Sequence, residues 1–238
     1  HEFSIMGFTD GENIVFAPTT YDYPYRYDDD KGPGTGGMGC VSYKNKLLPF
    51  LSEEDLEKCY SIMKKALKEI NKDSKEFNGV LYGAFFKTEK DILFIEFNSR
   101  LGDPEALNVL TVMESSFADV AKLIADNKTL NTENCKFKEL DSYVIYVVSK
   151  GYAVEKQFTP LEFDFSDELL KEDGVKVYFS SSKKVAEQRY VSTGNSRLVA
   201  VVKASDDLMK IKAEVDALLK KYITDESLDY RTDIGTKI

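Results

Sequence analysis

The strongest constraint on the fold lies in residues 91–108, DILFIEFNSRLGDPEALN, where a strand pattern changes abruptly into a helix pattern. The apolar run Ile92–Ile95 predicts a β-strand that continues into polar residues. The strand pattern breaks at Leu101-Gly102, and a helix is expected to begin at Asp103-Pro104-Glu105. Asp is a favoured N-cap residue, Pro suits the first helical position, and an acidic first turn suits the helix dipole. The segment therefore predicts a strand, a tight turn and a helix in immediate succession.

Three polar side chains follow the apolar run at alternate positions, namely Glu96, Asn98 and Arg100. Residues two apart on a strand point to the same side, so these three are expected to share one face. Carboxylate and amide oxygens are ligands that Mg²⁺ prefers, and a guanidinium binds phosphate oxygens with two parallel hydrogen bonds. A solvated sheet face explains the same alternation about as well on this stretch alone. The adjoining strand-turn-helix favours a functional site.

Composition limits the possible partners of the 238-residue chain. It is 42% hydrophobic and 31% charged, which is typical of a globular protein with a sizeable core. The net charge of −9 argues against nucleic acid or an anionic membrane as the main partner, and no apolar run approaches the length of a membrane helix. Cys40, Cys59 and Cys135 lack metal-site spacing and indicate free thiols in a reducing cytoplasm. The single histidine, His1, argues against a His-dependent triad or a zinc site.

Residues 19–40 form a predicted long polar loop, rich in Tyr, Asp and Gly. Its glycine-dense half, GPGTGGMG at 32–39, suits either a backbone cradle for a phosphate or carboxylate or a mobile linker. It is neither a Walker A loop nor a GxGxxG motif. For the run Asp28–Asp30, a solvated acidic turn is preferred to a metal site as the interpretation.

The remaining periodicity predicts an α+β chain. Ser52 and Asp55 form an expected capping box before a helix whose apolar stripe ends at Ile70. The other expected elements are a hairpin of 1–8 with 14–17, a buried strand at 80–86, helices at 104–113 and 117–125, a strand at 143–148 that starts a new sheet, strands at 158–165, 175–179, 190–191 and 197–202, and a helix at 206–222. Ser180–Ser182 is interpreted as a solvated turn.

Four sequence blocks together resemble one known family. They are GPGTGGMG at 32–39, GVLYGAFF at 79–86, IEFNSRLGDPEALNVL at 95–110 and the terminal YRTDIG at 230–235. In combination they are similar to glycinamide ribonucleotide synthetase, or phosphoribosylamine–glycine ligase, of the ATP-grasp superfamily, and most closely to its archaeal type. Asp22–Tyr25 stands where many members have Asp-His-Lys-Arg.

The resemblance implies a ligase that forms glycinamide ribonucleotide, ADP and phosphate from ATP, glycine and 5-phosphoribosylamine through glycyl phosphate, in purine biosynthesis. It implies metal ligation of Mg²⁺ or Mn²⁺ by Glu96 and Asn98, and catalytic roles for Arg100 and Asp103. It also implies that Gly36, Gly37, Met38 and Gly39, together with Arg100, help to bind ATP or substrate. No covalent enzyme intermediate is required, in keeping with the lack of an activated nucleophile.

The resemblance further implies an ATP-grasp catalytic portion, an antiparallel sheet with helices, at 1–126, a connector at 127–141 and a smaller C-terminal sheet-plus-helix domain at 142–238. The chain is expected to be about the C-terminal half of the enzyme, to need the N-terminal half as partner and not to turn over by itself. Two alternatives remain open. One is an ATP-grasp ligase of another carboxylate and amine, and the other is a non-catalytic ATP-grasp half that acts as a partner module.

Overall fold

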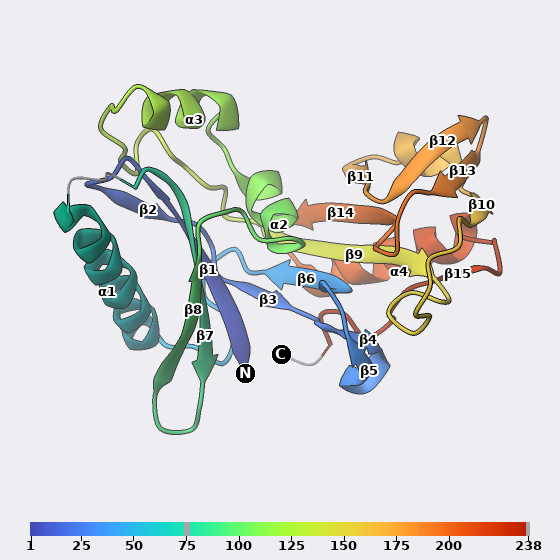
Figure 1. The fold of residues 1–238 in the computed structure, drawn as a ribbon, viewed down its shortest axis with the longest axis horizontal. Coiled ribbons are helices and arrows are strands. Elements are labelled where there is room, and N and C mark those ends of the chain that lie inside the picture. The colour runs from blue at the N-terminus through green and yellow to red at the C-terminus, as the bar shows by residue number, and fades with distance from the viewer. Residues whose placement is uncertain (74–76, 237–238) are drawn as a thin grey trace.

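A computed structural model describes residues 1–73 and 77–236 of the chain. Its main feature is a ten-stranded sheet with the strand order β11-β14-β9-β6-β3-β1-β7-β8, in which β2 also pairs with β1 and β15 with β9 (Figure 1). All of the ladders in this sheet are antiparallel within the described residues. The predicted α+β class with an antiparallel sheet and helices is therefore confirmed.

The first part of the sheet is built from two hairpins. Strand β1 (Glu2–Thr9) pairs with β2 (Ile14–Phe16), as the hairpin pattern predicts. On its other side β1 pairs with β7 (Gly79–Lys87), which returns through a turn at Thr88 as β8 (Ile92–Asn98). Strand β8 is the last in the order and so forms an edge of the sheet.

The prediction of one long loop at 19–40 is wrong. This segment contains four short strands and a 3₁₀ helix: β3 (Thr20–Asp22), β4 (Tyr25–Tyr27), η1 (Asp28–Asp30), β5 (Lys31–Gly34) and β6 (Gly39–Ser42). Strands β3 and β6 pair with each other inside the main sheet, whereas β4 and β5 form a separate ribbon. Tertiary pairing overrides the turn-rich composition here.

Helix α1 (Glu53–Ile70) begins as predicted, because Ser52 and Asp55 form a complete capping box. The expected apolar stripe from Leu56 to Leu67 is buried, but Ile70 is 44% exposed and does not belong to the core. A short 3₁₀ turn, η2 (Asn71–Asp73), follows the helix.

Helices α2 (Glu105–Val112) and α3 (Phe117–Ala125) confirm the two helices expected after the strand. The N-terminus of α2 differs from the prediction, because Pro104 is the N-cap residue and no side chain caps it. The Asp103 carboxylate instead receives hydrogen bonds from Tyr146 and Arg197. The prediction of Asp103 as N-cap is therefore wrong, and its carboxylate links different parts of the chain.

The prediction that a new sheet starts at 143–148 is also wrong. Strand β9 (Asp141–Ser149) lies between β6 and β14 (Val199–Ser205) in the main sheet. Beyond β14 lies β11 (Val175–Phe179), and the two-residue β15 (Leu228–Asp229) pairs with the end of β9. The division into domains at 127–141 stays a prediction, but strands from both sides of this segment belong to the same sheet.

A second, three-stranded sheet lies beyond the main one, with the order β10-β13-β12. Its strands are β10 (Glu162–Asp164), β12 (Ser182–Ala186) and β13 (Arg189–Ser192), and the 3₁₀ helix η3 (Asp167–Lys171) lies close by in the chain. Ser182 thus opens a strand rather than a turn. Helix α4 (Leu208–Tyr222) packs against β9 and β14 through its buried face.

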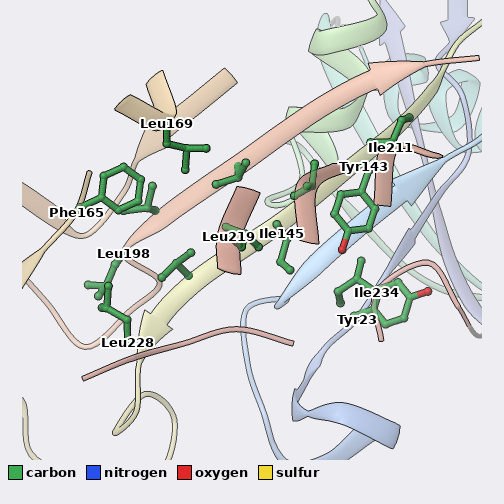
Figure 2. Close-up of a cluster of buried hydrophobic side chains, with 14 of the residues drawn as sticks. Tyr23, Tyr143, Ile145, Phe165, Leu169, Leu198, Ile211, Leu219, Leu228 and Ile234 are labelled. Atoms are coloured by element: carbon green, nitrogen blue, oxygen red, sulfur yellow. The ribbon is translucent and has the colours of Figure 1, made fainter. Parts of the chain in front are cut away.

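A cluster of buried side chains joins α4, the main sheet and the three-stranded sheet (Figure 2). It includes Tyr143 and Ile145 from β9, Ile211 and Leu219 from α4, and Ile234 near the C-terminus (Figure 2). Tyr23, far away in sequence, lies beside Ile234 in the same cluster, and its hydroxyl oxygen accepts a hydrogen bond from the Gly235 N–H at 2.8 Å. The C-terminus is therefore anchored against the first part of the chain.

The remaining general predictions concern cysteines and membranes. Cys40, Cys59 and Cys135 are free and buried, as expected. In the described part of the chain, no helix has both the length and the apolar character needed to cross a bilayer.

Candidate active site

The predicted metal ligands lie side by side at the end of β8. The Asn98 side-chain amide donates a hydrogen bond to Glu96 Oε1 at 2.9 Å, so the two side chains share one face as expected. Glu96 is exposed and Asn98 partly exposed. Within residues 1–73 and 77–236, no three His, Cys, Asp or Glu side chains gather as a metal site, so a metal here would rely on one carboxylate and one amide. Both groups offer hard oxygen donors of the kind that Mg²⁺ prefers.

Arg100 lies past the end of β8, in the turn rather than on the strand. Its guanidinium carbon is 5.9 Å from the centre of the Tyr82 ring, and Nη1 donates to the Leu101 carbonyl at 3.1 Å. Tyr82 is the cross-strand neighbour of Asn98. The exposed guanidinium therefore lies beside the expected metal ligands. Its contacts with the Tyr82 ring and the Leu101 carbonyl hold it there, whereas the prediction relied on strand alternation.

The face of the sheet that carries Glu96 and Asn98 continues across β8, β7 and β1, and this face is called the polar floor. Glu96 is opposite Ala84, and Ala84 is opposite Ser4. Directly paired residues in an antiparallel sheet project to the same side, so these three form one row. On β3, Asp22 lies two residues after Thr20, the partner of Ser4, and so faces the same side.

Glu105, at the start of α2, lies over this floor. Its Oε1 accepts a hydrogen bond of 2.8 Å from the Tyr82 hydroxyl, and the residue is only 4% exposed. Burial raises the pKa of Glu105, and it raises the pKa of Asp22 well above its usual range, where the negative charge of Glu105 adds to the effect. Burial and the charge of Glu105 thus both disfavour an isolated negative charge on Asp22.

The glycine-rich segment packs beside this pair rather than presenting an open cradle. The N–H of Gly36 donates to the Tyr152 hydroxyl at 3.2 Å, that of Gly37 to Thr35 Oγ1 at 3.0 Å and that of Met38 to the Tyr23 carbonyl at 2.8 Å. Gly37 has φ +98, and a Cβ there would lie 2.6 Å from Asp22 Oδ1. Its missing side chain therefore allows the chain to pass close to Asp22.

Asp103 is held at this site by residues from the second half of the chain. Its Oδ1 accepts a hydrogen bond from the Tyr146 hydroxyl at 2.8 Å, and its Oδ2 accepts one from Arg197 Nη2 at 2.8 Å. Arg197 Nη1 also donates to the carbonyls of Gly36 and Gly37, and the guanidinium stacks 4.4 Å from the centre of the Tyr146 ring. Arg197 thus connects two of the predicted site segments.

Sequence reasoning missed Asp22, Glu105 and Arg197 as components of this site. Asp22 was noted as part of a polar loop and as the first residue of the Asp22–Tyr25 departure from the family pattern, and Glu105 only as a first-turn acid. Arg197 lies 94 residues from Asp103 in sequence and carries no local pattern that predicts their contact. Only the tertiary fold brings these residues together.

Comparison with known proteins identifies related sequences and structures. Residues 1–106 match the model of the phosphoribosylglycinamide synthetase ATP-grasp (A) domain. A phosphoribosylamine–glycine ligase of Methanococcus maripaludis is 37% identical over 237 residues, which are 99% of this chain and 52% of that protein. Over almost its whole length the chain is similar to phosphoribosylamine–glycine ligases. It spans about half the length of the curated relatives that it matches.

Solved structures agree on the fold. The phosphoribosylamine–glycine ligase of Thermotoga maritima has a TM-score of 0.81 at 21% identity, over 99% of this chain and 56% of that one. The biotin carboxylase domain of a Hydrogenobacter thermophilus 2-oxoglutarate carboxylase, crystallised with MgADP, has a TM-score of 0.67 at 16% identity, over 96% of this chain and 46% of that one. The chain therefore has the ATP-grasp fold.

Proposed function

We propose that the natural protein carrying this chain ligates glycine to 5-phosphoribosylamine at the expense of ATP. The products are glycinamide ribonucleotide, ADP and phosphate, formed through glycyl phosphate in de novo purine biosynthesis. The observation that carries the proposal is the grouping of Glu96, Asn98 and Arg100 at one sheet edge, within a chain similar to phosphoribosylamine–glycine ligases. We also propose a cytoplasmic location, which the free thiols of the chain support.

Glu96 and Asn98 fit a divalent metal ion, Mg²⁺ or Mn²⁺. Both supply oxygen donors, they are adjacent, and both are accessible from solvent. Mg²⁺ is usually bound by one or two such side chains together with substrate phosphates. When bound, the ion would neutralise charge on the phosphates of ATP. A biotin carboxylase domain that shares this fold was crystallised with MgADP, which supports a nucleotide and a divalent ion as ligands of this chain.

An apolar surface beside the metal ligands suits the adenine base. Phe86 and Leu93 are cross-strand partners on β7 and β8, and they are 41% and 54% exposed. Phe86 follows Ala84 by two residues and therefore lies on the same face as Glu96. Exposed aromatic and aliphatic side chains next to convergent polar groups are typical of ligand sites.

The chemistry requires positioning and charge neutralisation rather than a protein nucleophile. A carboxylate oxygen of glycine attacks the γ-phosphorus of ATP, and ADP leaves with the electrons of the broken bond. The phosphoribosylamine nitrogen then attacks the carbonyl carbon of glycyl phosphate, phosphate leaves, and the nitrogen loses a proton. We propose that Arg100 stabilises the negative charge on the transferring phosphoryl group.

Asp103 and the segment Gly36–Gly39 have supporting roles in this proposal. Both carboxylate oxygens of Asp103 already accept hydrogen bonds, and the N–H groups of Gly36, Gly37 and Met38 have protein acceptors. We therefore propose that these residues seat the substrates by fixing the shape of the floor. In this proposal, Arg100 is the residue that contacts the phosphate groups.

The decisive experiment measures ADP release by the natural protein with Mg²⁺, glycine and freshly generated phosphoribosylamine, each supplied and omitted. We expect release only when all three are present. Glu96→Ala should lower kcat about 100-fold or more, because charge neutralisation in the transition state is lost. Glu89→Ala is the matched control, since Glu89 is an exposed carboxylate at the tip of the same hairpin. Release that ignores glycine, or equal activity of both variants, would contradict the proposal.

A further inference from the structure

A groove follows the edge of β2 that faces away from β1, its pairing partner. It is lined by residues 14–16 of β2, by Tyr60 of α1, by Lys46 and by side chains from 114–137, and its volume is about 360 Å³. Ligand pockets usually have volumes of about 300–1,000 Å³. Strand β8, which carries Glu96, is three strands away in the order β2-β1-β7-β8, or roughly 14 Å. The groove is therefore separate from the candidate active site, and we call it the β2 groove.

Aromatic side chains form one wall of the β2 groove. The rings of Phe16 and Tyr60 stack with their centres 4.0 Å apart and their planes inclined by 8°. Both residues are partly exposed, and the buried Phe137 also lines the groove. Aromatic rings present large apolar faces on which planar ligands stack. The wall therefore suits a planar, aromatic group.

Lysines give the β2 groove a charge unlike that of the whole chain, which has a net charge of −9. Lys46 and Lys136 line the groove, and the Nζ of Lys64 lies 5.8 Å from the centre of the Phe16 ring at its margin. Among the described residues, none of these three lysines forms an ion pair with a carboxylate. The lining also contains one carboxylate, that of Glu114. The excess of unpaired cations favours an anionic ligand.

The backbone holds both lining lysines in place. Lys46 has φ +61, a left-handed conformation that is uncommon for residues other than glycine, and its carbonyl oxygen accepts a hydrogen bond from the Thr19 hydroxyl at 2.8 Å. Its Nζ lies 5.8 Å from the centre of the Phe137 ring. The Lys136 N–H donates a hydrogen bond to Ser115 Oγ at 2.9 Å. Both cations are thus carried by a fixed backbone, which lowers the entropy cost of binding a ligand.

We propose that the β2 groove is a second ligand site, which binds a nucleoside monophosphate. The base packs on the wall formed by Phe16 and Tyr60, and the phosphate binds to the ammonium groups of Lys46 and Lys136. A lysine ammonium is a compact charge that commonly binds phosphate. A nucleoside monophosphate combines a planar ring with a phosphate, the two groups that the lining suits. The inference goes beyond the proposed function and does not depend on it, because none of these residues belongs to the candidate active site.

The first test measures AMP binding to the natural protein by isothermal titration calorimetry. Lys46→Gln should raise the Kd of one AMP site about tenfold or more, because a charge-assisted hydrogen bond to the phosphate is lost. Lys46→Arg retains the charge, and its Kd should stay within about threefold of the wild-type value, which excludes misfolding as the cause. Lys210→Gln, which changes an exposed lysine on α4, is the matched control and should have no effect. Unchanged AMP affinity in Lys46→Gln would overturn the proposal.

A second measurement locates the site in the wild-type protein. Photolabelling with 8-azido-AMP, followed by peptide mass spectrometry, should modify peptides that contain Phe16 or Tyr60. Excess AMP should prevent this labelling, and adenosine should be at least about tenfold less effective because it lacks the phosphate. Label confined to residues 79–105, beside the candidate active site, would overturn the proposal, and so would equal protection by inorganic phosphate.

Steady-state ADP release separates this inference from the proposed function. The KM for ATP should change less than about twofold in Lys46→Gln, because the groove is remote from Glu96. A KM for ATP that rises in parallel with the Kd for AMP would show a single shared site and overturn the inference. Absence of glycine-dependent release in the wild type contradicts the proposed function alone.

Discussion

Arg197→Met removes the guanidinium that joins the second half of the chain to the candidate site. The residue is 7% exposed, and its Nη1 donates to the backbone carbonyls of Gly36, Gly37 and Asp103. Its Nη2 pairs with the Asp103 carboxylate at 2.8 Å. Methionine fills part of the same volume and leaves these acceptors without a donor.

The loss in free energy of unfolding depends on whether water can replace Arg197 as the hydrogen-bond donor to each acceptor. The Asp103 side chain is 53% exposed, so its carboxylate is largely resolvated and contributes about 1 kcal/mol. The Gly37 carbonyl lies in a buried residue, and an unsatisfied buried acceptor costs about 1–3 kcal/mol. Loss of the stacking on Tyr146 adds about 0.5–1 kcal/mol. We therefore expect a loss of about 3 kcal/mol in the free energy of unfolding.

Urea unfolding followed by far-ultraviolet circular dichroism measures this loss, since the chain contains no tryptophan. Arg189→Met is the matched control, because Arg189 has two carboxylate partners, Glu162 and Asp164, whereas Arg197 has one, Asp103. That side chain is 47% exposed and its partners are 61% and 65% exposed, so its removal should cost less than about 1 kcal/mol. Equal losses in the two variants would refute the reasoning that burial, and not the number of ion pairs, sets the cost.

Two further predictions test packing and charge. Gly39→Ala should lower the free energy of unfolding by about 1–3 kcal/mol, because the added Cβ would lie 2.5 Å from the Val144 carbonyl oxygen. The control, Gly34→Ala, should be nearly neutral, because its added Cβ would have no atom within 4 Å. Thermal unfolding of the two variants measures the difference. Burial raises the pKa of Asp233, but hydrogen bonds from Arg231 outweigh it and hold the pKa at about 2, below its usual 3.8. Because this pKa is lowered on folding, the ionised Asp233 stabilises the folded state at pH values above 3.8. Roughly 2 kcal/mol of the free energy of unfolding should therefore be lost as the pH falls from 3.8 through 2. Asp233→Asn should remove this contribution to the pH dependence measured by urea titration.

Local sequence signals predicted those parts of the fold that depend on neighbouring residues. The capping box of Ser52 and Asp55 fixed the start of α1, since both hydrogen bonds lie within one turn. The alternation of Glu96 and Asn98 placed both on one face, since β8 carries the pair. Arg100 was expected on the same strand, but β8 ends at Asn98, and contact with Tyr82 restores its position.

Long-range contacts account for the errors. The glycines and tyrosines of 19–40 indicated a loop, because no local pattern shows that three-residue strands such as Thr20–Asp22 will pair with distant partners. Asp103 has the residue type and position of an N-cap, but Arg197 and Tyr146 bind its carboxylate. The raised pKa of Asp22 arises from burial and from Glu105, which sequence patterns do not place nearby.

The pairing of β6 with β9 has a consequence for how the protein would tolerate a cut in its backbone. Strand β9 follows segment 127–141 in the chain, but its hydrogen bonds tie it to β6, which precedes that segment. A break in this connector would therefore leave the two pieces joined along a strand ladder and through the Arg197–Asp103 contact. We therefore expect the two pieces to remain associated as complementary fragments, since each would expose an unpaired strand edge on its own.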